Sequence, residues 1–310
     1  MASSVYQIAL LGKLDQPINA FFEQYSNEAI KYFLYDGERK YLYDLIQVSK
    51  VIYLEKLNRF GDAQKFLEDL AVNKNNFIQD KEIYTFQSKS NESTLNMYEM
   101  YSKLLARNGS LSEAKVYALK GIEIARLDKM YERSLELWTT LGSIYIKQNK
   151  LNLAECCFRT ALKLKDKVKR EYLLAYVYIQ LGMLHDNLGD LKRSEKSFLN
   201  ARKYSKKTND VYLETQALSG LGDCYIKLKK DDKVHQCFSE ALELAEKHLF
   251  IDQKNKILLK LAIYLKDIGD PTFTNYALDF FHSYAKGGEK EMNNTHEQIK
   301  NHTVGDPPGS

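Results

Sequence analysis

Apolar residues and glycines recur along the middle of the chain in a fixed order. The clearest unit contains Trp138, Leu141, Gly142, Tyr145, Ala154, Phe158 and Ala161. Similar residues return 40 positions later as Tyr178, Leu181, Gly182, His185, Ser194, Phe198 and Ala201, and 40 positions after that as Leu218, Leu221, Gly222, Tyr225, Val234, Phe238 and Ala241. Spacings of three and four within each half of a unit predict two amphipathic helices, with turns at 149–150, 189–190 and 229–231.

Weaker copies extend the pattern in both directions. A later copy contains Leu258, Leu261, Ala262 and Leu265, and earlier copies contain Tyr98, Leu105, Ala114, Ala118 and Gly121, and then Leu54, Phe60, Ala63 and Leu67. Because the 310 residues include only 4 prolines and 15 glycines, we predict an all-α chain. We expect N-terminal helices over residues 1–40, about six repeats over residues 41–286, and a disordered tail over residues 287–310, part of it typical of vector-derived sequence.

The order Trp-x2-Leu-Gly-x2-Tyr followed by Ala-x3-Phe resembles the tetratricopeptide repeat, or TPR. The resemblance implies units of a first helix (A) and a second helix (B) that stack into a right-handed superhelix. The glycines of the pattern would let helices A and B approach closely, and its phenylalanines would fill the gap to the next pair. The period of 40 residues exceeds the usual length of about 34, which predicts longer helices and a longer B-to-A link.

Composition argues against several classes of protein. The net charge of +4 is mild for this length, whereas a dedicated nucleic-acid binder concentrates basic residues on one face. No apolar run approaches the roughly 20 residues of a membrane span, and no signal peptide is visible. The cysteines favour a reducing, cytoplasmic location. We expect all four to be buried: Cys156, Cys157, Cys224 and Cys237.

No catalytic or metal-binding motif is visible in the sequence. The histidines lie outside any His-Glu-x2-His motif and do not pair with cysteine at zinc-ligand spacing; they are His185, His235, His248, His282, His296 and His302. We therefore predict that the protein is not an enzyme and carries no metal and no cofactor. His185 occupies the Tyr145 position of its repeat, which favours a packing role over a ligand role.

Two basic runs lie near predicted helix ends. The first contains Lys163, Lys165, Lys167, Lys169 and Arg170, and the second contains Arg202, Lys203, Lys206 and Lys207. Their alternation around helix ends favours a solvated surface. The alternative is a contact with an acidic partner or a nucleic-acid backbone.

The TPR resemblance implies that the A helices line a concave groove. We expect exposed positions one, five and nine residues after the Trp138 position. The first set is Glu99, Thr139, Ile179, Ser219 and Leu259, the second is Lys103, Ser143, Met183, Asp223 and Ile263, and the third is Arg107, Lys147, Asn187, Lys227 and Asp267. From these we predict eight peptide-binding residues: Arg107, Lys147, Asn187, Lys227, Asp223, Ser143, Met183 and Lys103.

The chemistry of the third set supports this prediction. Cations suit a carboxylate, and an asparagine amide can both donate to and accept from a peptide backbone. The alternative is that a cation near the end of an A helix complements the helix dipole and meets solvent.

Long units rich in Tyr, Lys and Asn, with the Leu181-Gly182 and Gly189-Asp190 signatures, resemble the RRNPP peptide receptors of Gram-positive bacteria, which include Rap, NprR and PlcR. The resemblance covers residues 40–285. It implies a cytoplasmic quorum sensor that binds a short signalling peptide in the groove, gripped at its backbone by Asn187. Binding would change conformation or homodimerisation and so control transcription or sporulation. Residues 1–40 show no helix-turn-helix, so DNA contact would need a domain not present in this chain.

Two alternatives stay open. The first is a TPR scaffold or co-chaperone adaptor that holds the tail of a protein partner. The second is a Rap-like phosphatase acting on a response regulator, which would need a side chain such as Gln24 or Gln47 in the N-terminal helices. Apolar residues near the C-terminal end, among them Phe273, Phe280 and Phe281, would cap the array or form a dimer contact.

Overall fold

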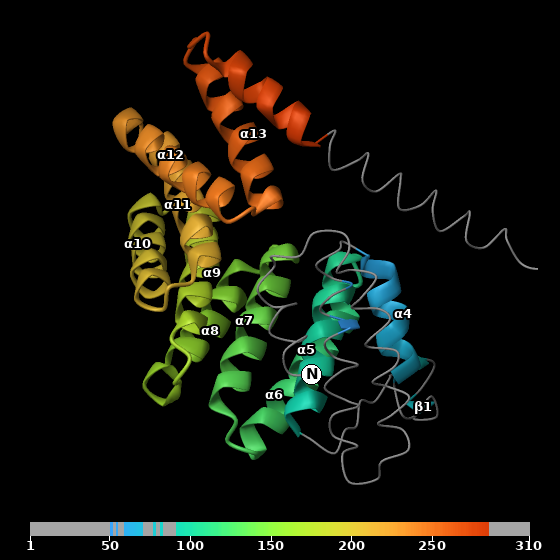
Figure 1. Cartoon of the computed structure of the whole chain (residues 1–310). Coiled ribbons are helices and arrows are strands. Elements are labelled where there is room, and N and C mark those ends of the chain that lie inside the picture. The colour runs from blue at the N-terminus through green and yellow to red at the C-terminus, as the bar shows by residue number, and fades with distance from the viewer. Residues whose placement is uncertain are drawn as a thin grey trace, which may run out of the picture. The chain divides into compact units, whose positions relative to one another are not determined.

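The computed structural model describes residues 50–51, 54, 59–70, 77–78, 81–82 and 91–284 (Figure 1). The chain divides into two compact units, Met1–Leu184 and His185–Ser310. The predicted N-terminal helices over residues 1–40 and the predicted tail over residues 287–310 lie outside the described residues, as do Gln24 and Gln47.

The described residues form a succession of antiparallel helices. Those of the first unit are α4 (Phe60–Leu70), α5 (Asn91–Arg107), α6 (Leu111–Leu127), α7 (Tyr131–Lys147), α8 (Leu151–Leu162), the short 3-10 helix η1 (Lys165–Lys167) and most of α9 (Tyr172–Asn187). Those of the second unit are α10 (Leu191–Lys207), α11 (Val211–Lys227), α12 (Asp231–Lys247), α13 (Ile251–Asp267) and a helix over residues 273–284. Helices α5, α7, α9, α11 and α13 are A helices. The all-α tandem TPR fold is confirmed.

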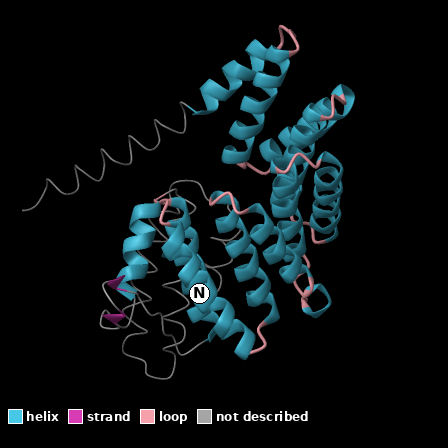
Figure 2. Ribbon diagram, turned by 180° about the vertical axis from the view of Figure 1, so that it is seen from behind, coloured by secondary structure: helices cyan, strands magenta, loops and turns pink. Residues whose placement is uncertain are grey.

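One small element was not predicted. Strands β1 (Phe77–Ile78) and β2 (Lys81–Glu82) pair antiparallel, with Phe77 opposite Glu82 (Figure 2). They lie in the connection between α4 and α5.

Most helices end in the same way. A residue with positive φ follows the helix at intervals of 20 positions, apart from one interval of 40 after Asn149: Gly109, Lys129, Asn149, Gly189, Asn209, Lys229, Leu249 and Gly269. The next backbone N–H then donates to the carbonyl five residues back, as Lys150 does to Tyr145 at 2.8 Å. This is the Schellman arrangement, which satisfies carbonyl groups that the helix leaves open.

These turns show where the extra residues of the long repeat lie. Helices α5, α6, α7, α10, α11, α12 and α13 each contain 17 residues. The links between them are short (Figure 2), as at residues 128–130 and 208–210. The predicted lengthening is therefore in the helices. The predicted longer B-to-A link occurs only after α8 among the described repeats, at residues 163–171.

Gly142 and Gly222 are sites of close helix contact, as predicted. A Cβ atom at Gly142 would lie 2.4 Å from Phe158, and one at Gly222 would lie 2.6 Å from Phe238. Both phenylalanines thus pack against helix A of their own repeat, a contact that the prediction of gap filling between pairs did not include. The contact with the next repeat is seen at Phe198, whose ring would lie 2.3 Å from a Cβ at Gly220.

Buried polar and sulfur groups follow most of the sequence expectations. His185 is buried and its Nδ1 lies 3.1 Å from Ser197 Oγ, which confirms the packing role. Cys157, Cys224 and Cys237 are buried, but Cys156 is exposed, so the expectation that it is buried is wrong. Burial raises the pKa of Cys157 to about 12 and that of Cys237 to about 11.

Candidate functional site

The A helices expose only part of the face that the sequence assigned to a ligand. Arg107, Lys147, Asn187 and Lys227 are exposed near the ends of their helices, as expected. The positions one residue after the Trp138 position are buried in four repeats, at Glu99, Thr139, Ile179 and Ser219. The expectation of exposure was wrong there because consecutive A helices, such as α5 and α7, pack directly against each other.

In the first unit, several predicted site residues contact the neighbouring repeat. The Lys147 ammonium donates to the Ala106 carbonyl at 2.8 Å. Burial lowers the pKa of Lys147, and the charge of the nearby Arg107 lowers it further. The Ser143 hydroxyl donates to Gln180 Oε1 at 2.9 Å. The Arg107 guanidinium lies 4.2 Å from the centre of the Phe60 ring.

The second unit repeats this arrangement with other residues. The Lys227 ammonium lies 2.7 Å from Asp186 Oδ2. Asp223 pairs at 2.5 Å with Lys260, which also donates to Ser219 Oγ at 2.9 Å. Burial raises the pKa of Asp223, although the Lys260 charge opposes that change.

A common spacing links these contacts. Partners on consecutive A helices are 37 or 41 positions apart, as in Ser143–Gln180 and Lys147–Ala106. The two spacings differ by four, so a side chain meets two successive turns of one face of the next A helix. Cations that the sequence assigned to a ligand carboxylate therefore also tie one repeat to the next. Asn187 and Met183 are exposed as well.

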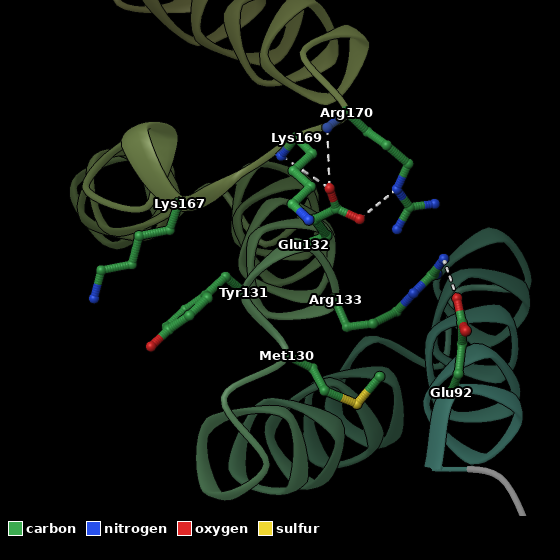
Figure 3. Close-up of a pocket in the computed structure, with 8 residues that line it drawn as sticks. All are labelled: Glu92, Met130, Tyr131, Glu132, Arg133, Lys167, Lys169 and Arg170. Atoms are coloured by element: carbon green, nitrogen blue, oxygen red, sulfur yellow. Dashed lines mark hydrogen bonds and ion pairs between the residues drawn. The ribbon is translucent and has the colours of Figure 1, made fainter.

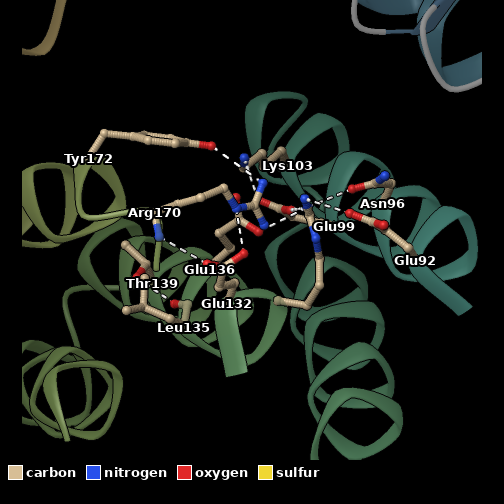
Figure 4. A network of polar contacts seen from close by, with 11 residues as sticks. Glu92, Asn96, Glu99, Lys103, Glu132, Leu135, Glu136, Thr139, Arg170 and Tyr172 are labelled. Carbon is tan, nitrogen blue, oxygen red and sulfur yellow. Dashed lines mark hydrogen bonds and ion pairs between the residues drawn. The ribbon is translucent and has the colours of Figure 1, made fainter. Parts of the chain in front are cut away.

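A network of polar contacts lies on α5, α7 and the start of α9 (Figure 4). Arg133 is central: its Nη1 donates to Asn96 Oδ1 at 2.6 Å and lies 2.9 Å from Glu136 Oε2 and 3.6 Å from Glu99 Oε2. The predicted site residue Lys103 belongs to the same cluster and lies 2.6 Å from Glu99 Oε1. Sequence reasoning missed Arg133 and Glu136.

The two buried carboxylates of this cluster differ in protonation. Burial and the Glu99 charge raise the pKa of Glu136 to about 7. Burial acts on Glu99 in the same direction, but the charge and hydrogen bond of Lys103 outweigh it and lower the pKa of Glu99. The carboxylate with its own lysine thus stays charged, and its neighbour titrates near neutral pH.

Helix α7 carries a stripe of polar atoms that its neighbours do not satisfy. On α7, Arg133 Nε and Thr140 Oγ1 are buried without a hydrogen-bond partner, and Glu136, whose Oε2 lies 2.9 Å from Arg133 Nη1, stands between them. Spacings of three and four place them on one face of α7, the face that continues to Ser143 and Lys147. An unsatisfied buried polar atom costs about 1–3 kcal/mol, so this stripe is a candidate binding surface.

Sequence comparison assigns the repeats to a class. Residues 135–167, 175–207 and 215–248 each match the tetratricopeptide repeat family. The three matches are 40 residues apart and each covers most of one A–B pair. The chain therefore carries TPR repeats, a fold whose stacked pairs present extended binding surfaces.

Solved structures share this fold at low sequence identity. BtubC from P. vanneervenii is 17% identical, with a TM-score of 0.55, and the match covers 74% of this chain and 89% of that protein. The apo form of RapI is 15% identical, with a TM-score of 0.57, covering 92% of this chain and 77% of RapI. A Rap protein complexed with competence and sporulation factor is 14% identical, with a TM-score of 0.55, covering 82% and 77%. At these identities, the similarity shows a shared fold.

Three further observations bear on function. No curated protein matches this chain in sequence. Within the described helices, none is long and apolar enough to cross a membrane. Among the residues that the structure describes, no group of three or more His, Cys, Asp or Glu side chains is placed to hold a metal ion.

Proposed function

We propose that this chain is a peptide-binding TPR domain that senses a short signalling peptide in the cytoplasm through the face of its A helices. The observation that carries the proposal is the polar stripe of α7 formed by Arg133, Glu136 and Thr140, in which Arg133 Nε and Thr140 Oγ1 are buried without a hydrogen-bond partner. An extended peptide backbone offers both acceptors and donors. The fold shared with a Rap protein complexed with competence and sporulation factor supports the proposal at the level of architecture.

The contacts between repeats give the proposal its regulatory element. Lys147 and Ser143 bridge consecutive A helices, and a ligand that binds these side chains competes with the bridges. Binding and the packing of neighbouring repeats are then coupled, because a ligand shifts an equilibrium by its differential affinity for the two arrangements. We propose that this coupling drives the output and that the chain performs no catalysis.

The test begins with panning a pool of random hexapeptides against the full chain. The strongest binder is then titrated by calorimetry into the wild type and into Thr140→Val and Lys147→Met. Thr140→Val keeps the side-chain volume and removes an unsatisfied hydroxyl, so we expect unchanged or higher stability and about threefold to tenfold weaker binding.

The matched control is Lys196→Met. Lys196 is an exposed lysine on the B helix α10, so its removal changes the net charge as Lys147→Met does, without touching an A helix. Equal binding by all three variants would contradict a site on the A helices. Retention of no peptide by the wild type would contradict peptide sensing, and a pull-down that yields a large partner protein would favour the scaffold alternative.

A further inference from the structure

The link between α8 and α9 breaks the regularity of the repeat. Helix α8 ends at Leu162, after 12 residues, and residues 163–171 follow before α9 begins. The link contains η1 and then the extended residue Val168, which is buried. Residue 169, which corresponds to the left-handed turn residues of the other links, has no positive φ.

A carboxylate from another helix holds this link in place. Glu132, at the start of α7, accepts hydrogen bonds from the backbone N–H groups of Lys169 and Arg170, both at 3.0 Å (Figure 3). It also pairs with the Arg170 guanidinium at 2.5 Å. Although burial alone would raise it, these N–H donors lower the pKa of Glu132, so its carboxylate stays charged and bound to the link.

The link and the start of α7 enclose a pocket of about 320 Å³, which also reaches the first turn of α5 (Figure 3). Four cations line it, Arg133, Lys167, Lys169 and Arg170, against two carboxylates, Glu92 and Glu132. The carboxylates are already engaged: Glu132 holds the link, and Glu92 lies 3.6 Å from Arg133. Positive charge is therefore in excess in this pocket.

The excess positive charge comes from Lys167 and Lys169. The Lys167 ammonium lies 4.6 Å from the centre of the Tyr131 ring, and in the described part of the chain neither Lys167 nor Lys169 forms an ion pair. Both side chains are exposed. Met130 and Tyr131 add an apolar surface beside these charges.

We propose that this pocket binds a carboxylate of the peptide partner, either an acidic side chain or the free C-terminus, next to an apolar residue. The inference rests on the proposed function and names the partner's chemistry. The ammonium groups would pair with the carboxylate, and Met130 and Tyr131 would cover the apolar neighbour. The carboxylates of Glu92 and Glu132 disfavour a doubly charged phosphate, because like charges repel strongly at short distance.

The pocket is continuous with the polar face of the A helices. Arg133 and Arg170 line the pocket, and the charges of both also lower the pKa of Glu99 in the neighbouring cluster. Figure 4 shows Arg170 in this cluster with Glu99 and Glu136. A peptide that lies along the stripe of α7 can therefore place an acidic group in the pocket. The basic run that first suggested a solvated surface then has a binding role at two of its lysines.

The test compares two double variants of the same link. Lys167→Ala/Lys169→Ala removes the two ammonium groups of the pocket, and Lys163→Ala/Lys165→Ala removes two exposed lysines that do not line it. Neither pair alters the backbone N–H groups that Glu132 binds. The probe is the best hexapeptide from the random pool, labelled and measured by fluorescence anisotropy on the full chain, as the free acid, as the C-terminal amide, and with its acidic side chains converted to amides.

We expect Lys167→Ala/Lys169→Ala to weaken binding of the free acid by about tenfold or more, as loss of charge-assisted hydrogen bonds predicts, and the control pair to change it less than about twofold. The amide forms show whether the terminus or a side chain enters the pocket. Equal loss in both double variants, or an RNA oligonucleotide that outcompetes the peptide, would overturn the inference alone. If no peptide binds the wild type, the proposed function fails with it.

Discussion

The links after α8 and α10 occupy the same place in successive repeats, but different contacts hold them. After α10, residues 208–210 form a tight turn with Asn209 at φ 54°, and the Asp210 side chain accepts the Leu213 N–H at the start of α11. After α8, residues 163–171 form an open link that depends on Glu132 of a different helix. In the link after α10, a side chain of the link itself caps the next helix. The link after α8 is held by a side chain from α7 instead, and exposed lysine side chains remain beside the pocket.

The largest expected effect tests the dependence on Glu132. Glu132→Ala removes the acceptor of two backbone N–H groups and of Arg170. Because the side chain is partly exposed, we expect a loss of about 3 kcal/mol in the free energy of unfolding, less than the sum of three charge-assisted bonds. Thermal and urea unfolding measure it, and Glu132→Gln, which keeps an acceptor oxygen, should lose less. A change within about 0.5 kcal/mol would show that the link closes without Glu132.

The next effect concerns the cluster that adjoins the open link. The raised pKa of Glu136, about 7, means that the folded state binds a proton between pH 5 and 7 that the unfolded state has released. The contribution of protonated Glu136 to the free energy of unfolding is therefore present at low pH and is lost as the pH rises through about 7. Glu136→Gln should be more stable than the wild type at pH 8 by about 2 kcal/mol and similar to it at pH 5.

Thermal unfolding between pH 5 and 8 measures this difference. The control is Glu123→Gln, because Glu123 is exposed on α6. Parallel pH profiles for the wild type and Glu136→Gln would contradict a raised pKa of Glu136 in the folded protein.

The closed link gives a smaller expected effect. Asp210→Ala removes the side-chain cap of α11, which accepts the Leu213 N–H at 2.9 Å. Loss of such a cap costs about 1 kcal/mol, and Asp210→Asn should restore most of it. Amide hydrogen exchange at the start of α11 locates the effect. A loss as large as that of Glu132→Ala would remove the contrast between local and distant closure.

The smallest effect is a gain in stability at another closed link. Leu249 has φ 56° and is exposed, although a large side chain disfavours this left-handed conformation. Leu249→Gly should raise the free energy of unfolding by roughly 0.5–1 kcal/mol. Asn209→Gly is the matched change at φ 54° and should gain less, because asparagine tolerates the conformation. Equal gains would show that the side chain at this position carries no strain.

The repeat could be predicted from the sequence because its signals are local. Gly142 with Phe158 and Gly222 with Phe238 recur at fixed spacing, and the packing of each pair follows from that spacing. The contact of Phe198 with the next repeat was predicted as well, but its partner Gly220 lies outside the repeated pattern and was not predicted.

The candidate site was predicted only in part. The predicted exposure near helix ends was correct for Arg107, Lys147 and Asn187, because a position in the last turn of an A helix can be recognised from the repeat spacing alone. The burial of Glu99 and the cluster around Arg133 were not predicted, because they depend on which residues of three helices meet at spacings of 37 and 41. Nor could the sequence show that α8 ends five residues early.

The 20-residue spacing of the left-handed turns also bears on how the gene can change. Gly189 and Lys229 occupy equivalent turns, 40 residues apart, with φ values of 73° and 54°. An in-frame deletion or duplication between such points rejoins the chain with the same backbone geometry on both sides, and every remaining A helix stays an A helix. Array length can therefore vary by whole repeats through recombination, but a break between Glu132 and Arg170 would also remove the carboxylate that holds the link after α8.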